Sequence, residues 1–411
     1  MTIGSDSSYK SLSSKIGNLN RLIAALAVED FPIEDGQQAV SLLAKQAEKL
    51  QSYLLIFKEA EHDTQQQIAY HVQYKVASIC FVLGVLARAN TMRNPFELHQ
   101  PFKRLSQRFF QDPIYLILSS EWKYVPFTYP MSIQDLPSFI VIGMPAPESE
   151  NVLVFPAAGH ELGHSIWFKA ALGEQISQDV RRRAEDEVNS HPQVLEALFP
   201  HEGRDQEDLF GRYVNEMFVS EIVNSSLAQC EELFCDFVAI GIFGRSYLRA
   251  FDYLISPGGN GERSLEYPAT KDRASSINSF ADKLGLGIAS FEERFLNEKS
   301  PTMPYNIEVI RLADAVRAGM EQKIGDMALQ VLKDANLSPP TPNAVDATLA
   351  FFKSGMPNVG DASLGELVEA AWLMYEENFE ETAVSELIES TSDLVLKSAE
   401  AREFISLAEN A

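Results

Sequence analysis

The sequence has few cysteines, fewer basic than acidic residues, and a polar stretch at residues 1–15. Three cysteines among 411 residues are too few for a disulfide framework, which indicates a reducing compartment. The 58 Asp and Glu residues outnumber the 34 Lys and Arg residues, and the formal net charge of −24 disfavours binding to nucleic acid or to an anionic membrane. Residues 1–15 are polar and rich in Ser, so we expect no secretory signal.

Long uncharged apolar runs are also missing from the early part of the chain. The longest one, Val76–Ala87, has 12 residues. A helix needs about 20 apolar residues to span a bilayer, so this run predicts a buried helix and no membrane span. Together with the polar start, this favours a cytoplasmic protein. An apolar content of 45% is enough for a packed core.

Among the seven histidines, one pair has the spacing of a metal site. His160 and His164 are four residues apart, so on an α-helix both can point at one metal ion. Glu161 then lies beside the metal, where its carboxylate can take a proton from an attacking water. This HExxH pattern predicts a zinc peptidase helix, although two ordinary helix histidines would fit it as well. Gly159 and Gly163 predict that the helix packs closely against a neighbour.

A catalytic zinc site needs a third protein ligand and one open position. The stretch Cys230–Ala239 has an apolar stripe and predicts a second helix, running to about residue 243. Glu232 and Asp236 lie four residues apart on one face of that helix. We predict that Glu232 is the third ligand and that Asp236 accepts the N–H of a metal-bound His, which fixes its tautomer.

Other side chains near these helices are alternative ligands. Glu231 takes the ligand position if the helix register differs by one residue. Cys230 and Cys235 can serve as soft zinc ligands, although cysteines in such positions are more often small buried residues. His191 and His201 lie in a charged, loop-like stretch, and we expect them to be exposed.

The HExxH motif at His160, followed by Glu232-x-x-x-Asp236, resembles the gluzincin metallopeptidases, in which two helices carry the two His and the Glu ligands. The separation of 68 residues between His164 and Glu232 is longer than in thermolysin. It is similar to that of the CAAX-prenyl-protease-like gluzincins, which are usually membrane-bound. The resemblance covers about residues 120–285.

A third block, Tyr267–Arg273, is similar to the His-Pro-Pro-x-x-x-Arg stretch that follows the Glu helix in several such peptidases. Tyr267 stands where His is usual, which weakens the comparison at that position. The resemblance implies that Tyr267 or Arg273 donates a hydrogen bond or charge to the oxyanion of the transition state.

Helical periodicity dominates both ends of the chain, and a β-rich stretch precedes the first metal helix. The predicted helices span residues 14–28, 37–62, 64–90, 96–110, 175–188, 209–226, 306–319, 345–352, 364–375 and 383–407. The predicted strands span residues 115–118, 122–129 and 139–143. We expect the last strand to be a sheet edge that binds a peptide by strand addition. Residues 256–261 predict a flexible loop.

These patterns predict a mainly α fold with a small mixed β-sheet. The predicted organisation is a helical N-terminal region at residues 1–115, a zincin-like metallopeptidase core at residues 116–290, and an acidic helical C-terminal region at residues 291–411. Residues 361–411 hold 13 acidic and two basic residues interleaved with apolar ones, which indicates a folded acidic face.

The predicted function is a cytoplasmic zinc metallopeptidase that hydrolyses a peptide or protein substrate. Zn²⁺ is held by His160, His164 and Glu232, and Glu161 is the general base. One alternative is a catalytically silent, zincin-like binding or scaffold protein whose helical flanks bind a protein partner. A second alternative is a zinc hydrolase of a non-peptide amide.

Overall fold

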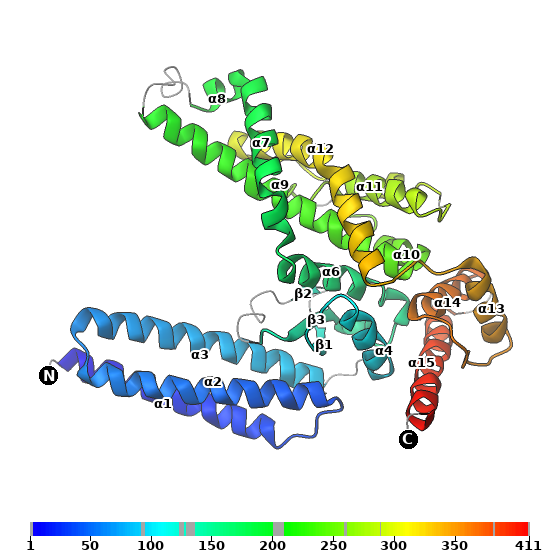
Figure 1. The fold of residues 1–411 in the computed structure, drawn as a ribbon, viewed down its shortest axis with the longest axis horizontal. Coiled ribbons are helices and arrows are strands. Elements are labelled where there is room, and N and C mark those ends of the chain that lie inside the picture. Colours follow the sequence, from blue (N-terminus) through cyan, green and yellow to red (C-terminus); the bar gives the residue numbers. More distant parts are fainter. Residues whose placement is uncertain are drawn as a thin grey trace. The chain divides into compact units, whose positions relative to one another are not determined.

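The computed structural model describes residues 3–91, 95–122, 127–128, 136–199, 209–258, 261–287, 289–380 and 383–409. It divides into two compact units, Met1–Glu150 and Asn151–Ala411. The described residues are mainly helical and include one small mixed sheet, which confirms the predicted class (Figure 1). The division falls at neither residue 115 nor residue 290, and the three-part organisation stays a prediction.

Three long helices make up most of the first unit: α1 (Ile3–Ala27), α2 (Glu34–Glu59) and α3 (His62–Thr91) (Figure 1). Apolar side chains three or four residues apart along each helix form their common core. Helix α1 begins 11 residues before the predicted start at residue 14. The polar first turns carry little apolar periodicity, and packing of Tyr9 and Leu12 onto the bundle accounts for the longer helix.

The sheet of the first unit has the order β1-β3-β2, with β1 (Tyr115–Glu121), β2 (Phe127–Thr128) and β3 (Phe139–Pro145). Strand β3 pairs parallel with β1 and antiparallel with β2. The prediction that β3 is an edge strand is therefore wrong. Every residue of β3 is buried, which is typical of a central strand, and Ile142 and Gly143 already pair with β2.

Of the strand predicted over residues 122–129, only Phe127–Thr128 is a described strand. Residues 123–126 and 129 lie outside the described residues. The short β2 still fixes the position of β3, because Phe127 pairs with Gly143 and Thr128 pairs with Ile142.

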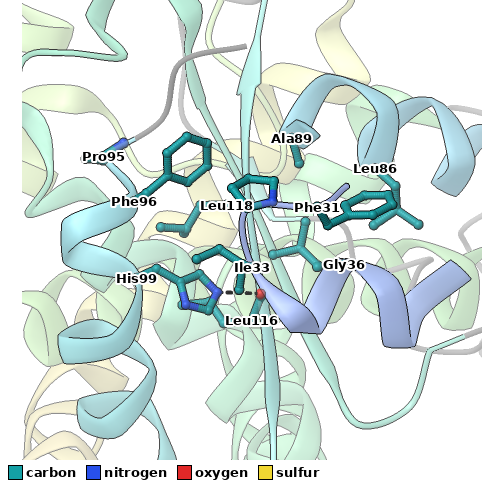
Figure 2. A pocket seen from close by; sticks show the side chains of 12 residues that line it. Phe31, Ile33, Gly36, Leu86, Ala89, Pro95, Phe96, His99, Leu116 and Leu118 are labelled. Carbon is teal, nitrogen blue, oxygen red and sulfur yellow. Dashed lines mark hydrogen bonds between the residues drawn. The ribbon is translucent and has the colours of Figure 1, made fainter. Parts of the chain in front are cut away.

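A small apolar cavity lies beside β1 (Figure 2). It is lined by residues that precede or begin α2 and by residues of α3, α4 (Phe96–Gln107) and β1. His99 borders it, and its Nε2–H donates to the Leu116 carbonyl at 2.8 Å. Burial lowers the pKa of His99. The cavity volume of about 30 Å³ suits roughly two water molecules, which is too small for a peptide side chain with its backbone.

Helix α3 contains the one segment among the described residues, His62–Asn90, that is long and apolar enough to cross a membrane by length and composition. The most apolar stretch of this segment has a mean hydropathy of 1.4, and a third of that stretch is buried. A single such helix is a weak indication of a span, because the core helix of a globular protein meets the same criteria. The absence of a membrane span stays a prediction.

The second unit is organised around one 35-residue helix, α9 (Leu209–Phe243). It contacts α6 (Ala157–Lys169), α7 (Leu172–Ser190), α10 (Arg245–Ile255), α11 (Thr270–Lys283) and α12 (Pro304–Asp334) (Figure 1). The sequence predicted two separate helices over this stretch, and that prediction is wrong. Leu227, Ala228 and Gln229 are good helix formers and continue the helix through the predicted break.

The remaining helices of this unit are shorter or terminal. They are α8 (Pro192–Leu198), α13 (Pro342–Lys353), α14 (Leu364–Asn378) and α15 (Val384–Glu409), with single 3₁₀ turns η2 (Val152–Val154) and η3 (Glu292–Arg294). A further 3₁₀ turn, η1 (Ala146–Glu148), ends the first unit. The loop predicted at residues 256–261 is a turn at 256–257, and residues 259–260 lie outside the described residues.

Helices α6 and α9 pack at very short range. A Cβ atom at Gly163 would lie 2.6 Å from the Cα of Cys235, and one at Gly159 would lie 2.8 Å from the ring of Phe243. Both distances are shorter than real Cβ contacts, so only glycine fits at these positions. This confirms the predicted close packing and brings the side chains of α6 and α9 together.

Candidate metal centre

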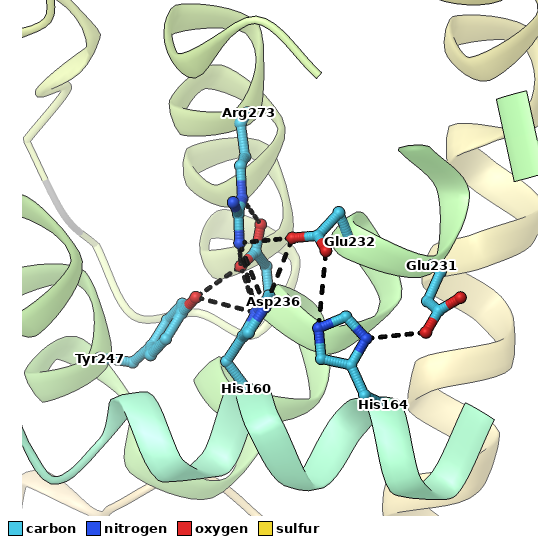
Figure 3. Close-up of polar contacts among 7 residues, drawn as sticks. All are labelled: His160, His164, Glu231, Glu232, Asp236, Tyr247 and Arg273. Carbon is cyan, nitrogen blue, oxygen red and sulfur yellow. Dashed lines mark hydrogen bonds and ion pairs between the residues drawn. The ribbon is translucent and has the colours of Figure 1, made fainter. Parts of the chain in front are cut away.

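The two helices present the predicted residues to each other (Figure 3). His160 and His164 lie on one face of α6, with their rings 4.9 Å apart and nearly perpendicular. Glu232 and Asp236 lie one turn apart on α9. Except for His164, which is partly exposed, these side chains are buried. The structure therefore brings together the three residues predicted as ligands.

The Nε2 atoms of both histidines face the carboxylate of Glu232. The distance from His160 Nε2 to Glu232 Oε2 is 3.4 Å, and the distance from His164 Nε2 to Glu232 Oε1 is 3.5 Å. Neighbouring ligand atoms in a tetrahedral zinc site, with bonds of about 2.0–2.1 Å, lie about 3.3–3.4 Å apart. Glu232 Oε2 is also buried without a hydrogen bond, although an η nitrogen of Arg273 forms an ion pair with it at 3.2 Å. The spacing and this acceptor fit a bound cation.

The Nδ1 atoms of the two histidines are held by two further carboxylates. His160 Nδ1 lies 2.9 Å from Asp236 Oδ1, and His164 Nδ1 lies 2.7 Å from Glu231 Oε1. An ionised carboxylate only accepts hydrogen bonds, so each Nδ1 carries the proton and each Nε2 is the atom left for a metal. Asp236 thus takes the predicted position. Glu231, considered as an alternative ligand, instead orients His164.

Asp236 is itself fixed by two donors (Figure 3). Arg273 donates from Nε to Asp236 Oδ2 at 2.6 Å and from an η nitrogen to Oδ1 at 2.7 Å. The Tyr247 hydroxyl donates to Oδ1 at 2.5 Å. Burial alone would raise the pKa of Asp236, but Arg273 and His160 hold it well below its usual range. The carboxylate that orients His160 is therefore ionised.

The resemblance implied that Arg273 donates to the oxyanion of the transition state, but in the structure its contacts are with carboxylates of the centre. Arg273 is buried, its Nε and one η nitrogen donate to Asp236, and the same η nitrogen lies 3.2 Å from Glu232 Oε2. This arrangement positions two carboxylates of the centre. Donation by Arg273 to an oxyanion stays a prediction.

Tyr267 lies at the edge of the centre. Its side chain is 48% exposed, and it lines a cavity together with Arg273. Partial burial raises the pKa of its hydroxyl, and the charges of Glu232 and Glu161 raise that pKa further. The protonated hydroxyl can therefore donate a hydrogen bond, and its contact with a substrate stays a prediction.

Glu161 lies inside the same electrostatic cluster. It is 5% exposed, and burial raises the pKa of its carboxyl, while the charges of His160 and His164 lower it. For His160, burial lowers the pKa, but Asp236 and Glu232 outweigh burial and raise it to about 10. A metal that binds His160 must therefore displace a proton.

Cys235 is the other side chain near both histidines. Ligand atoms of His160, His164 and Cys235 all lie within 4.8 Å of one another. However, Cys235 packs beneath Gly163 on the contact between the helices, and burial together with nearby carboxylates raises its pKa well above the usual value. Glu232 fits the third position better, because its two oxygens face the Nε2 atoms of the two histidines.

The remaining alternatives lie away from the centre. Burial raises the pKa of Cys230 to about 12, and this buried thiol is not part of the His160 cluster. His191 directly follows α7, and its Nδ1 lies 2.8 Å from the carbonyl oxygen of Glu187. It is partly buried, which differs from the exposed position expected from the sequence. His201 lies outside the described residues.

Tyr247 and the role of Glu231 were missed by the sequence analysis. Tyr247 is on α10, the helix after α9, and no motif spacing marks it. Glu231 precedes the predicted ligand directly, and only the facing geometry of α6 gives it a partner. No family model matches the chain, and comparisons with curated proteins and with solved structures found no match.

Proposed function

We propose that this protein is a zinc-dependent metallopeptidase with His160, His164 and Glu232 as the metal ligands. The observation that carries the proposal is the arrangement of the two imidazoles. Both Nε2 atoms face one carboxylate at 3.4 and 3.5 Å, and both Nδ1 atoms are held by other carboxylates. A zinc ion bound there would act as a Lewis acid and lower the pKa of a water molecule towards 7.

Glu161 takes the general-base role in this proposal. It accepts a proton from the attacking water and returns it to the leaving amine. Burial raises the pKa of its carboxyl, which brings proton exchange closer to neutral pH, where a general base is most effective. Asp236 and Glu231 keep the imidazoles in one tautomer, and the Tyr267 hydroxyl donates to the substrate carbonyl.

The position of Glu161 favours an enzyme over a scaffold protein. A structural zinc site is closed by its protein ligands and needs no general base. Here an acid that is not a ligand lies next to His160 in the chain, buried among the same charges. We therefore place the catalytic role above the binding role of the helical flanks.

Metal analysis and hydrolysis together test the proposal. Zinc content is measured by mass spectrometry on wild type, Glu161→Gln, Glu232→Ala and the control Glu221→Ala, which lies on α9 about three turns before Glu232. Wild type, Glu161→Gln and Glu221→Ala should hold about one zinc per chain, and Glu232→Ala should lose it. Hydrolysis of a mixed peptide library should fall by a factor of about 10²–10⁴ in Glu161→Gln.

Three results would overturn the proposal. Wild type that binds no zinc, after purification without chelators and with zinc supplied, would leave two histidines on a helix. Equal peptide hydrolysis by wild type and Glu161→Gln would exclude Glu161 as the base. A zinc-loaded wild type that cleaves small amides but no peptide would favour the non-peptide alternative.

A further inference from the structure

The second unit holds a cavity next to the candidate metal centre. Its volume is about 160 Å³, and it is lined by residues of α10, of the segment before α11, of the first turn of α11 and by Glu298. Arg273 belongs both to its wall and to the centre, because an η nitrogen lies 3.2 Å from Glu232 (Figure 3). Pockets for whole drug-sized ligands measure about 300–1,000 Å³, so this cavity suits one side chain of a larger substrate.

One side of the cavity is apolar. Phe251 and Ile255 of α10 line it, together with Pro268. The Phe251 ring packs against Phe291 and Phe295, with ring centroids 6.2 and 5.6 Å away, and the Arg273 guanidinium lies 5.2 Å from its centroid. This side can pack against the aliphatic stem of a long side chain.

The two arginines of the wall are already neutralised. Arg273 is held by Asp236 and Glu232. Arg263 pairs with Asp314 at 2.6 Å and also donates to the carbonyl oxygens of Ser264 and Tyr267. Neither guanidinium is therefore left to attract an acidic side chain.

Neither glutamate of the wall forms an ion pair with another described residue. Glu298 accepts hydrogen bonds from the amide and hydroxyl of Thr270, at 2.8 and 2.5 Å, which are neutral groups. Glu262 is exposed. Burial raises the pKa of Glu298, but its hydrogen bonds with Thr270 and the charge of Arg263 outweigh burial and lower that pKa. The backbone around Glu262 is fixed, since Arg263 N donates to Lys299 O at 2.8 Å and Lys299 N donates to Gly261 O at 3.0 Å.

We propose that this cavity binds a lysine or arginine side chain of the substrate, with Glu262 and Glu298 selecting its positive charge. The aliphatic stem lies along Phe251 and Ile255, and the cationic end lies between the two carboxylates. The charge of the unit agrees with a cationic substrate, because residues 151–411 carry 43 of the 58 acidic residues and 21 of the 34 basic ones. This inference deepens the proposed function and rests on it.

Peptide binding tests the pocket without requiring turnover. The probes are fluorescent pentapeptides Ala-Ala-Xaa-Ala-Ala with Lys, Arg, Leu or Glu at the centre. Binding to the full-length Glu161→Gln variant, with and without zinc, is measured by fluorescence anisotropy. We expect the Lys and Arg peptides to bind about five- to tenfold more tightly than the Leu and Glu peptides.

Charge reversal at the pocket supplies the control. Glu262→Lys, added to Glu161→Gln, should abolish the preference for Lys and Arg. Glu266→Lys changes the net charge equally on the same exposed segment but does not line the cavity, so it should leave the preference unchanged. Glu298 is not mutated first, because it binds the start of α11 through Thr270.

Three outcomes would overturn the proposed lysine or arginine pocket. They are tighter binding of the Leu or Glu peptide, equal binding of the four peptides, or an equal loss of the preference for Lys and Arg in Glu262→Lys and Glu266→Lys. The last result would show that the peptides respond only to the net charge of the protein and not to the cavity. Zinc content of the same preparations separates this failure from that of the proposed function. Zinc bound without a charge preference overturns the pocket alone, whereas absence of zinc overturns the proposed centre whatever the peptides do.

Discussion

Glu231 is connected to the candidate centre by one hydrogen bond, 2.7 Å from His164 Nδ1. Carboxylates that orient metal-bound histidines typically contribute a factor of about 10–100 to metal affinity. We therefore expect Glu231→Ala to weaken zinc binding by about that factor, and Glu231→Gln to weaken it less because Gln still accepts a hydrogen bond. Competition with a chromophoric chelator measures both affinities, with Glu221→Ala as control. Unchanged affinity in Glu231→Ala would show that His164 needs no such support.

Glu369 of α14 gives a prediction away from the centre. It is buried, its Oε2 has no hydrogen bond, and Arg245 lies 3.7 Å from its other oxygen. Burial raises the pKa of the folded carboxyl above its usual value of 4.5, while Arg249 and Arg245 lower it. The folded chain thus holds this proton to higher pH than the unfolded chain, so this group's contribution to stability falls as pH rises above about 4.5.

Glu369→Gln should remove the loss of stability that accompanies ionisation of this buried carboxyl. We expect it to raise the free energy of unfolding at pH 7 by about 1 kcal/mol, with a smaller gain at pH 4, where the wild-type carboxyl is protonated in both states. Urea unfolding at the two pH values measures the difference. Glu377→Gln removes the same charge from the exposed side of α14, where Glu377 pairs with Lys353, and should change stability little. A gain that is independent of pH would contradict the ionisation argument.

At the scale of elements, the contact of α6 with α9 decides whether the centre forms. Gly163→Ala would place a Cβ 2.6 Å from the Cα of Cys235, a backbone atom that a side-chain rotation cannot move away. We expect a loss of about 1–3 kcal/mol in stability and weaker zinc binding, because α6 must shift away from Glu232. Chemical unfolding and zinc titration measure the two effects.

Gly17→Ala is the matched control for that substitution. Gly17 is exposed on α1, and an added Cβ would meet nothing within 4 Å. Because Ala is the better helix former, this variant should gain up to about 1 kcal/mol. If Gly163→Ala were equally stable and bound zinc normally, the close approach of α6 and α9 would not be needed for the site.

For the whole molecule, all residues of the candidate centre lie between His160 and Arg273, inside the second unit. We therefore expect the fragment 151–411 to fold alone and to bind zinc within about threefold of the full chain, since a compact unit with its own core can fold independently. Circular dichroism and zinc titration check this, with Glu232→Ala in the fragment as control. A folded fragment that binds no zinc would show that residues 1–150 contribute to the centre.

The sequence by itself determined the mainly helical class, because apolar residues recur every three or four positions along most of the chain. It also determined which residues share one face of a helix: His160 with His164, and Glu232 with Asp236. Local spacing suffices there, since a helix places residues four apart on one face. The close packing of α6 was readable for a similar reason, because glycine in a helix is unfavourable unless a neighbour needs the space.

Only the tertiary structure decided the rest. The central place of β3, the continuity of α9 and the division at residue 150 depend on pairing and packing between segments far apart in the chain. The same holds for Tyr247, Glu231 and Arg273, whose contacts join α6, α9, α10 and α11. A hydrogen bond to a carboxylate is made over about 3 Å in space and leaves no fixed spacing in the sequence, so no motif could have marked these partners.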